Sequence, residues 1–126
     1  MITLKLTPRP KPRMTKKSVW KHMDYFKWAG VLKAMKPEVN WIPLSIQFVL
    51  PMPKSWPEKK KKLFDGTEHL PTPDLDNMIK AIKDSLLKND SKVWCYGEMS
   101  KVWGREGLII FDPPPLSLDQ YQTRQL

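Results

Sequence analysis

Hydrophobic and polar residues alternate in three stretches of the chain, the pattern of strands that bury one face. The first stretch covers residues 2–6, and the second covers residues 44–50, which we expect to form a central strand. The third covers residues 93–102, where aromatic and β-branched residues favour a strand. Turn residues at 103–107 lead into the apolar run 108–111, so the last two strands are predicted to form a hairpin.

A longer stretch, residues 18–36, has apolar residues at helical spacing, with Ser18 as its N-cap and Pro37 after its end. We expect its aromatic residues to pack in the core, the alternative being that they stack on nucleic-acid bases. The predicted core stripe comprises Trp20, Met23, Phe26 or Lys27, Gly30 or Val31, and Ala34 or Met35, widened by Tyr25, Trp28 and Leu32.

Two more helices are predicted in the middle of the chain. Residues 55–58, Ser-Trp-Pro-Glu, have the residue types of a capping box and open a short helix that Gly66 closes. After Pro-Thr-Pro at residues 71–73, another helix begins near Asp74. Its predicted buried face, from apolar residues at helical spacing, comprises Leu75, Met78, Ile79, Ile82 and Leu86.

Length and composition narrow the class of protein. The 126 residues suit one domain, which we place at residues 1–112, followed by a Pro-rich tail at residues 113–126. The net charge of +9 favours a polyanionic partner, nucleic acid first. The single cysteine, Cys95, excludes an intrachain disulfide, suits a reducing cytoplasm and has no well-placed His for nucleophilic catalysis. No apolar run suits a membrane span or a signal peptide.

Basic residues gather in two segments that suit contact with a phosphate backbone, the alternative being a solvated surface. One is a stiff, Pro-rich segment at residues 8–17, and the other is the short helix after residue 57. We expect His22 to lie at the surface and His69 to be exposed in a loop, the alternative being that His69 touches the acidic site. The candidate nucleic-acid contacts are Arg9, Lys11, Arg13, Lys16 and Lys17 in the first segment and Lys59, Lys60, Lys61 and Lys62 in the second.

Three aspartates flank the helix that begins near residue 74, and they allow two interpretations. Asp74 and Asp76 suit a helix start, where an acid caps the first turn and meets the positive end of the helix dipole. With Asp90 beyond the helix, however, the acids exceed what capping needs. Converging carboxylates repel one another unless a cation holds them, and oxygen ligands suit Mg²⁺ or Mn²⁺. Asp90 reaches the other two only if the chain folds back as a strand.

The run Pro-Asp-Leu-Asp-Asn-Met-Ile-Lys-Ala-Ile-Lys-Asp-Ser-Leu, residues 73–86, resembles the signature helix of the RusA family of Holliday junction resolvases. Residues 8–15 resemble that family's N-terminal Pro-Arg-Pro segment, and residues 52–56 are similar to its Met-Pro-x-Ser-Trp segment. Residues 101–104 resemble the strand before its last turn. The resemblance covers residues 4–111 in the family's order.

The resemblance implies a small single-domain α+β fold, with a mixed or antiparallel sheet of about four strands and two main helices. It implies a homodimeric endodeoxyribonuclease, of phage or prophage association, that uses Mg²⁺ or Mn²⁺. Such an enzyme resolves four-way junctions by paired symmetric incisions in DNA recombination and repair. Asp74, Asp76 and Asp90 match the family's metal-binding acids, and Lys80 matches its functional lysine. Here Asn89 replaces the first acid of an Asp-Asp pair, and the loop before Asp90 is shorter.

Two alternatives stay open beside this resemblance. The amine of Lys80 suits stabilisation of a reacting phosphate, or an i,i+4 ion pair with Asp76 or Asp84. The chain as a whole suits a nuclease, or a non-catalytic nucleic-acid-binding protein that keeps the fold and uses its acids as caps. The candidate dimer interface comprises Trp94, Tyr96 and Val102, which would otherwise pack under the first helix.

Overall fold

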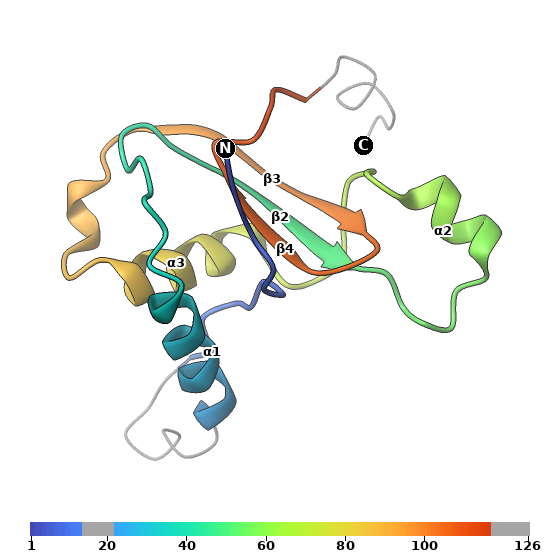
Figure 1. Cartoon of the computed structure of the whole chain (residues 1–126), viewed down its shortest axis with the longest axis horizontal. Helices are drawn as coiled ribbons and strands as arrows, with labels where there is room; N and C mark the ends of the chain where they lie inside the picture. Colours follow the sequence, from blue (N-terminus) through green and yellow to red (C-terminus); the bar gives the residue numbers. More distant parts are fainter. Residues whose placement is uncertain (14–21, 117–126) are drawn as a thin grey trace.

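The computed structural model describes residues 1–13 and 22–116, and these residues form one sheet with helices against it (Figure 1). Several predictions fall on residues outside these ranges. They concern the N-cap Ser18, the core residue Trp20, the basic residues Lys16 and Lys17, and most of the predicted tail.

The sheet is mixed and has four strands. In spatial order they are β1 (Ile2–Leu4), β4 (Leu108–Phe111), β2 (Leu44–Pro51) and β3 (Tyr96–Gly104). β4 pairs antiparallel with β1 and with β2, whereas β3 runs parallel to β2. The arrangement confirms the predicted α+β class, and it confirms that residues 44–50 form a central strand.

Three α-helices and a 3₁₀ turn complete the described fold. They are α1 (Met23–Ala34), α2 (Glu58–Phe64), α3 (Leu75–Leu86) and the 3₁₀ turn η2 (Asp90–Lys92). α3 begins where the sequence predicts. Within the described ranges, no helix has the length and apolar character needed to cross a membrane.

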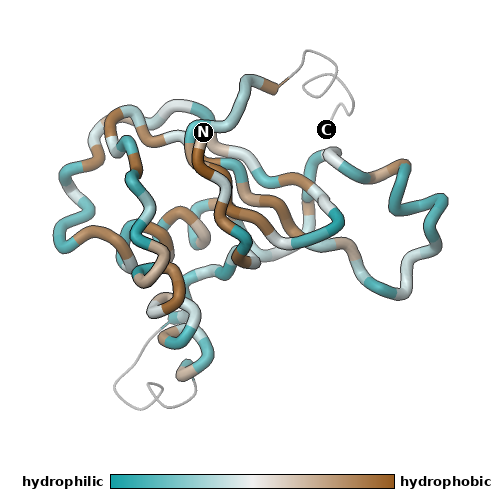
Figure 2. Tube along the Cα trace, viewed as in Figure 1, coloured by the Kyte–Doolittle hydropathy of each residue, from teal (hydrophilic) through white to brown (hydrophobic). Residues whose placement is uncertain are grey.

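The core lies between one face of the sheet and the inner faces of α1 and α3. Alternate residues of β2, Ile46 and Phe48, are fully buried, and they meet Met78 and Ile82 of α3 in one apolar cluster. Figure 2 shows apolar positions concentrated along the strands and polar positions along α2. Leu75 and Leu86 of the predicted buried face of α3 are partly buried and pack against this cluster. The core therefore fixes how α3 is rotated and which of its side chains face solvent.

The predicted hairpin of the last two strands is wrong, because β2 lies between β3 and β4. The end of β2 is buried on both faces, with Phe48, Val49 and Leu50 all inaccessible or nearly so. A strand of this kind is most stable at the centre of a sheet, where neighbours on both edges pair its backbone groups. β3 also begins at Tyr96, three residues later than predicted, and continues to Gly104.

The face of α1 that enters the core also differs from the prediction. Tyr25, Trp28, Ala29 and Leu32 are buried, whereas the predicted stripe residues Met23, Phe26, Val31 and Met35 are more than a third exposed. Apolar residues occur on all sides of this helix, so their spacing does not identify an inner face. Trp28 decides the rotation, because its indole Nε1 donates to the Thr7 carbonyl oxygen at 2.8 Å. Core packing of the buried aromatic residues is confirmed.

The predicted capping box at residues 55–58 does not form. α2 begins at Glu58, its N-cap is Pro57, and no side chain caps it. Trp56 instead turns back and packs against Trp103, with 4.9 Å between ring centroids. Gly66 follows the helix with φ of 80°, a left-handed conformation that glycine adopts without strain. α2 buries none of its residues and projects from the body of the fold (Figure 1).

Candidate active site

The N-terminus of α3 presents the first two aspartates to solvent. Asp74 is the N-cap residue, and its carbonyl oxygen accepts a hydrogen bond from the Met78 N–H at 3.2 Å. The Asp74 carboxylate makes no capping hydrogen bond and is exposed, and Asp76 is exposed in the first turn. Capping therefore does not account for the Asp74 carboxylate, which is free to bind another group.

The segment that leads to Asp74 is fastened to β3 by a lysine. Lys101 donates from Nζ to the carbonyl oxygens of Pro71, at 2.6 Å, and Pro73, at 2.9 Å. Burial lowers the pKa of Lys101, and the nearby charge of Asp74 opposes that shift. Lys101 therefore holds residues 71–73, which precede Asp74, against β3 at the edge of the sheet.

His69 is buried in this segment, so the prediction of an exposed histidine is wrong. Only 5% of the residue is exposed, and its ring centroid lies 4.2 Å from that of Trp103. The backbone N–H of His69 donates to the Lys101 carbonyl oxygen at 3.0 Å. This hydrogen bond pairs the loop with β3 as a short extra strand would. Burial, and then the charge of Lys101, lower the pKa of His69, so the ring is neutral at neutral pH.

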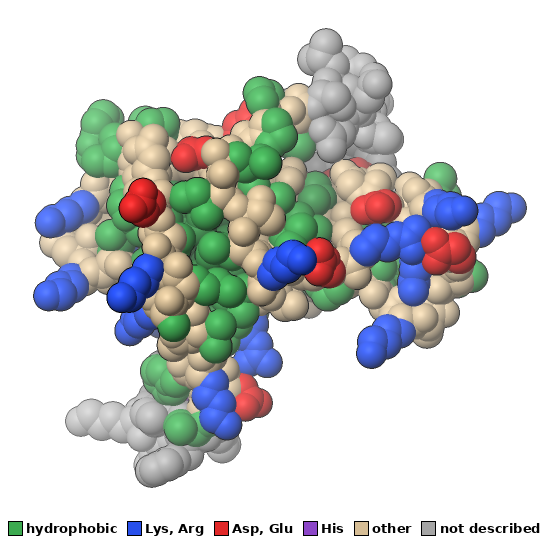
Figure 3. All heavy atoms as spheres, in the orientation of Figure 1, with side chains coloured by type: hydrophobic (Ala, Val, Ile, Leu, Met, Phe, Trp, Pro, Cys, Tyr) green, Lys and Arg blue, Asp and Glu red, His purple; other side chains and the backbone are tan. Residues whose placement is uncertain are grey.

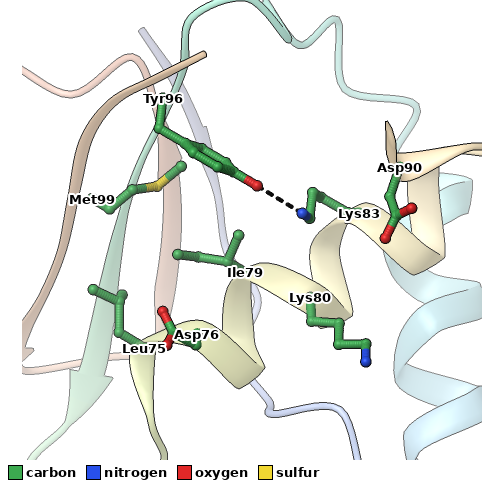
Figure 4. A pocket seen from close by; sticks show the side chains of 8 residues that line it. All are labelled: Leu75, Asp76, Ile79, Lys80, Lys83, Asp90, Tyr96 and Met99. Atoms are coloured by element: carbon green, nitrogen blue, oxygen red, sulfur yellow. Dashed lines mark hydrogen bonds between the residues drawn. The ribbon is translucent and has the colours of Figure 1, made fainter. Parts of the chain in front are cut away.

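A cavity of about 520 Å³ beside α3 is lined by acidic and basic side chains (Figure 4). Asp76 lies near one end of the helix in this view and Asp90 beyond the other. Lys83 reaches toward β3 and donates from Nζ to the Tyr96 hydroxyl oxygen at 2.7 Å, whereas the amine of Lys80 points away from Tyr96. The other lining residues are Leu75, Ile79 and Met99. Two predicted ligands therefore share one cavity.

The three predicted metal ligands are not gathered at one point. Asp74 lies in a neighbouring hollow with Pro10 and Asn77. An α-helix rises about 1.5 Å per residue, so Asp76 and the end of α3 are roughly 15 Å apart along its axis. Asp90 follows that end in η2 rather than in a returning strand, because the loop is too short to carry it back. Among the described residues, no three His, Cys, Asp or Glu side chains could hold a metal ion together.

The Pro-rich segment lies along α3 and brings basic side chains to Lys80. The Lys11 N–H donates to the Asn77 carbonyl at 3.0 Å, and the Lys11 amine pairs with the Asp84 carboxylate. A hollow of about 540 Å³ is lined by Lys11, Pro12, Arg13, Asn77 and Lys80. Within the described ranges Lys80 makes no ion pair, so the i,i+4 alternative is not observed. Arg9 is exposed at the surface of the same segment.

The lysines of α2 form a second basic surface, visible as the cluster of Lys and Arg side chains over this helix in Figure 3. Lys59, Lys60 and Lys62 are exposed, and Lys61 is half-buried. The amine of Lys60 lies 4.1 Å from the ring centroid of Trp56, a cation–π contact. Arg105 holds the start of α2 by an ion pair with Glu58 at 2.7 Å. The helix is therefore anchored at its base and displays its lysines outward.

Sequence analysis missed Lys83, Tyr96 and Lys101 as site residues. Lys83 lies three residues after Lys80, a spacing that places both on neighbouring turns, and this was the available signal. Tyr96 was assigned to an interface, and Val102 of the same interface is buried, with only 8% exposed. The partners of Lys83 and Lys101 lie 13 or more residues away in the sequence, so only the folded chain reveals them.

A protein-family model described as endodeoxyribonuclease RusA matches residues 5–109. That range includes all three aspartates, Lys80, the acidic cavity and the hollow lined by Lys11 and Arg13. No curated protein and no solved structure matches the chain.

Proposed function

The chain belongs to the RusA family of endodeoxyribonucleases, and from this premise we propose that it resolves Holliday junctions by paired symmetric incisions. The observation that carries the proposal is the cavity beside α3, where Asp76 and Asp90 face solvent together with lysines. A protein that only binds DNA gains nothing from carboxylates that face phosphate. We assign the activity to residues 1–112, with residues 113–126 as a tail.

In this proposal the lysine and arginine side chains bind the DNA phosphates, and the aspartate carboxylates are required for cleavage. Lys80 stands between the acidic cavity and the hollow that contains Arg13, so its amine is available to a phosphate oxygen in either direction. An ammonium at this place would stabilise the negative charge that develops on phosphate during hydrolysis, or protonate the leaving oxygen. Arg13 and Lys11 would hold the neighbouring phosphate of the same strand.

The proposed ligands of a divalent metal are Asp74, Asp76 and Asp90, which offer only oxygen atoms and so suit Mg²⁺, with Mn²⁺ as the second choice. Among the described residues these three carboxylates do not converge on one point. Family membership and the donor chemistry support the assignment. Metal dependence is therefore part of the test.

Junction resolution requires two incisions within one bound substrate, so we propose a homodimer with two equal sites. Trp94, which is 75% exposed, is the proposed centre of the contact. Tyr96 lies outside the proposed contact, because it lines the cavity of Asp76. We further propose that the protein acts in the cytoplasm, in recombination and repair of phage-associated DNA.

The deciding experiment incubates the protein with a labelled four-way junction and with a linear duplex of matched sequence, each with and without Mg²⁺. We expect symmetric cleavage of the junction alone, and only with Mg²⁺. Asp76→Asn should lower the cleavage rate at least 100-fold while junction binding is retained, because a carboxylate is lost and repulsion from phosphate falls. If the wild type binds the junction but cleaves it with no metal ion tested, the protein is instead a non-catalytic nucleic-acid-binding protein.

A further inference from the structure

The side chains of Lys83 and Tyr96 form a polar pair in the cavity of Asp76 and Asp90. The Lys83 amine donates to the Tyr96 hydroxyl oxygen at 2.7 Å and lies 5.4 Å from the centroid of the tyrosine ring. The two residues come from α3 and β3, and Figure 4 shows them meeting across the cavity. Lys83 lies within the run that resembles the family's signature helix, and Tyr96 lies outside that run.

The chemistry of this pair suits an anion. An ammonium that gives one N–H to a hydroxyl oxygen keeps two N–H donors. The hydroxyl that accepts this bond keeps its own O–H, and a hydroxyl polarised by a cation donates more strongly. The pair therefore presents several hydrogen-bond donors and one positive charge to the cavity of Asp76 and Asp90. A phosphate oxygen is the group that satisfies them in a protein that acts on DNA.

A purely structural role accounts poorly for the pair. Tyr96 is 46% exposed at the edge strand of the sheet, and the contact is solvent-exposed. Exposed contacts of this kind add little to stability, on the order of 0–1 kcal/mol for ion pairs. The apolar part of the cavity wall, which includes Ile79 and Met99, packs without help from the Lys83 amine.

The pair also differs in position from the basic residues already assigned. Lys80 shares a hollow with Lys11 and Arg13 beside the Pro-rich segment, and Tyr96 does not line that hollow. Lys83 and Tyr96 line the acidic cavity with Asp76 and Asp90, and the Pro-rich segment does not. Because Lys80 lines both hollows, a DNA strand held by the first group would enter the acidic cavity beside Lys83 and Tyr96, which could bind its next phosphate.

We propose that Lys83 and Tyr96 form a phosphate-binding pair that holds the DNA strand against the carboxylates of Asp76 and Asp90. This inference rests on the proposed function, since it names substrate contacts of the same site. It assigns to Lys83 a direct contact with a phosphate oxygen, and to Tyr96 a hydrogen bond to the same or the adjacent phosphate.

The test uses the full chain with Lys83→Met, Lys83→Arg and Tyr96→Phe. Lys5→Met is the matched control, because Lys5 is exposed beside β1 at the opposite edge of the sheet. Junction binding is measured by fluorescence anisotropy over a range of salt concentrations in EDTA, where no cleavage competes. Cleavage is measured in single turnover with Mg²⁺, and thermal unfolding checks that every variant is folded.

Lys83→Met should reduce the slope of log K against log salt by about 0.9, the value for one lost phosphate contact. It should also lower the cleavage rate about 100-fold, as loss of one donor to a developing charge does. Tyr96→Phe should leave the slope unchanged and lower the rate about tenfold, the effect of one neutral hydrogen bond. Lys83→Arg should keep the wild-type slope, and Lys5→Met should match the wild type in both measurements.

An unchanged salt slope in a folded Lys83→Met variant would overturn the proposal, whatever the cleavage assay gives. A wild type that binds the junction but does not cleave it would refute the proposed nuclease activity, while the salt slopes would still decide the phosphate contact. Equal slope losses in Lys83→Met and Lys5→Met would also refute the pair, since they would show a general effect of charge.

Discussion

The buried ring of His69 should make the free energy of unfolding depend on pH. Its ring is buried against Trp103, and burial lowers the pKa of His69 below the ordinary value of 6.5. Well above pH 6.5 the ring is neutral in both the folded and the unfolded chain. As the pH falls below 6.5, the unfolded chain takes up the proton first, so the free energy of unfolding decreases until the folded-state pKa is passed.

We therefore expect wild-type protein to lose stability between pH 7.5 and pH 5.5, as measured by urea unfolding at each pH. His69→Phe keeps an aromatic ring against Trp103 and cannot titrate, so this part of the pH dependence should disappear. His22→Gln is the control, because His22 is only partly buried, and it should keep the wild-type profile. A wild-type profile in His69→Phe would mean that His69 is solvated in the folded chain.

At the level of helices and strands, two glycines should respond oppositely to the same substitution. Gly104 ends β3, and a Cβ atom there would collide with the buried side chain of Val49 on β2. Gly30 lies in the middle of α1, exposed, and apart from its two chain neighbours and the helix's own backbone nothing lies within 4 Å of a new Cβ. The first site is tightly packed against its neighbouring strand, and the second is open.

Gly104→Ala should lower the free energy of unfolding by about 1–3 kcal/mol, the usual effect of overpacking. Gly30→Ala should raise it by about 0.5–1 kcal/mol, because alanine loses less backbone entropy in a helix. Urea unfolding at pH 7.5 measures both. A neutral Gly104→Ala variant would indicate that β2 and β3 separate enough to admit the methyl group, against the close pairing of Gly104 with Pro51.

The distribution of charge over the entire protein predicts how binding depends on salt. The lysines of α2 project away from the core, and each phosphate contact contributes about 0.9 to the slope of log K against log salt on duplex DNA. Replacing Lys59, Lys61 and Lys62 together with Gln should therefore reduce the slope by up to about 2.7. Lys60→Gln should reduce it less, because the amine of Lys60 already lies over Trp56.

Anisotropy titrations with the junction measure these slopes, and Lys5→Gln is the control. A triple variant with the wild-type slope would show that the lysines of α2 only keep the protein in solution. A reduced salt slope in Lys60→Gln alone would instead indicate that Lys60 and Trp56 form the DNA contact.

The proposed dimer is tested by analytical ultracentrifugation at micromolar concentration. The chain has a mass of 14.8 kDa, so we expect a species of twice that mass without DNA, and two protein chains per junction when junction DNA is added. Trp94→Lys should shift it toward the monomer, because a charge in the centre of an interface is costly to bury. A single species near 15 kDa that stays monomeric at one protein per junction would contradict paired incision.

Local pattern was enough to predict the acidic helix and the central strand. The apolar spacing of α3 has one clear stripe, and the Pro-Thr-Pro segment fixes where the helix begins, so neighbours in sequence decide both features. The same is true of β2, whose alternation ends at a proline. Asp74 and Asp76 were proposed from their place at the start of this helix, whereas Lys80 was proposed from the resemblance to the RusA family.

Features that depend on residues far apart in the sequence were decided only by the tertiary structure. β2 separates β3 from β4 because its end is buried on both faces, and no local pattern states which strands will flank it. Apolar residues occur on all sides of α1, so the hydrogen bond from Trp28 to the Thr7 carbonyl helps to set the rotation of this helix. Asp90 stays at the far end of α3 because a short loop cannot cross the length of the helix. His69 and Lys83 take their environments from β3, whose residues become their neighbours only on folding.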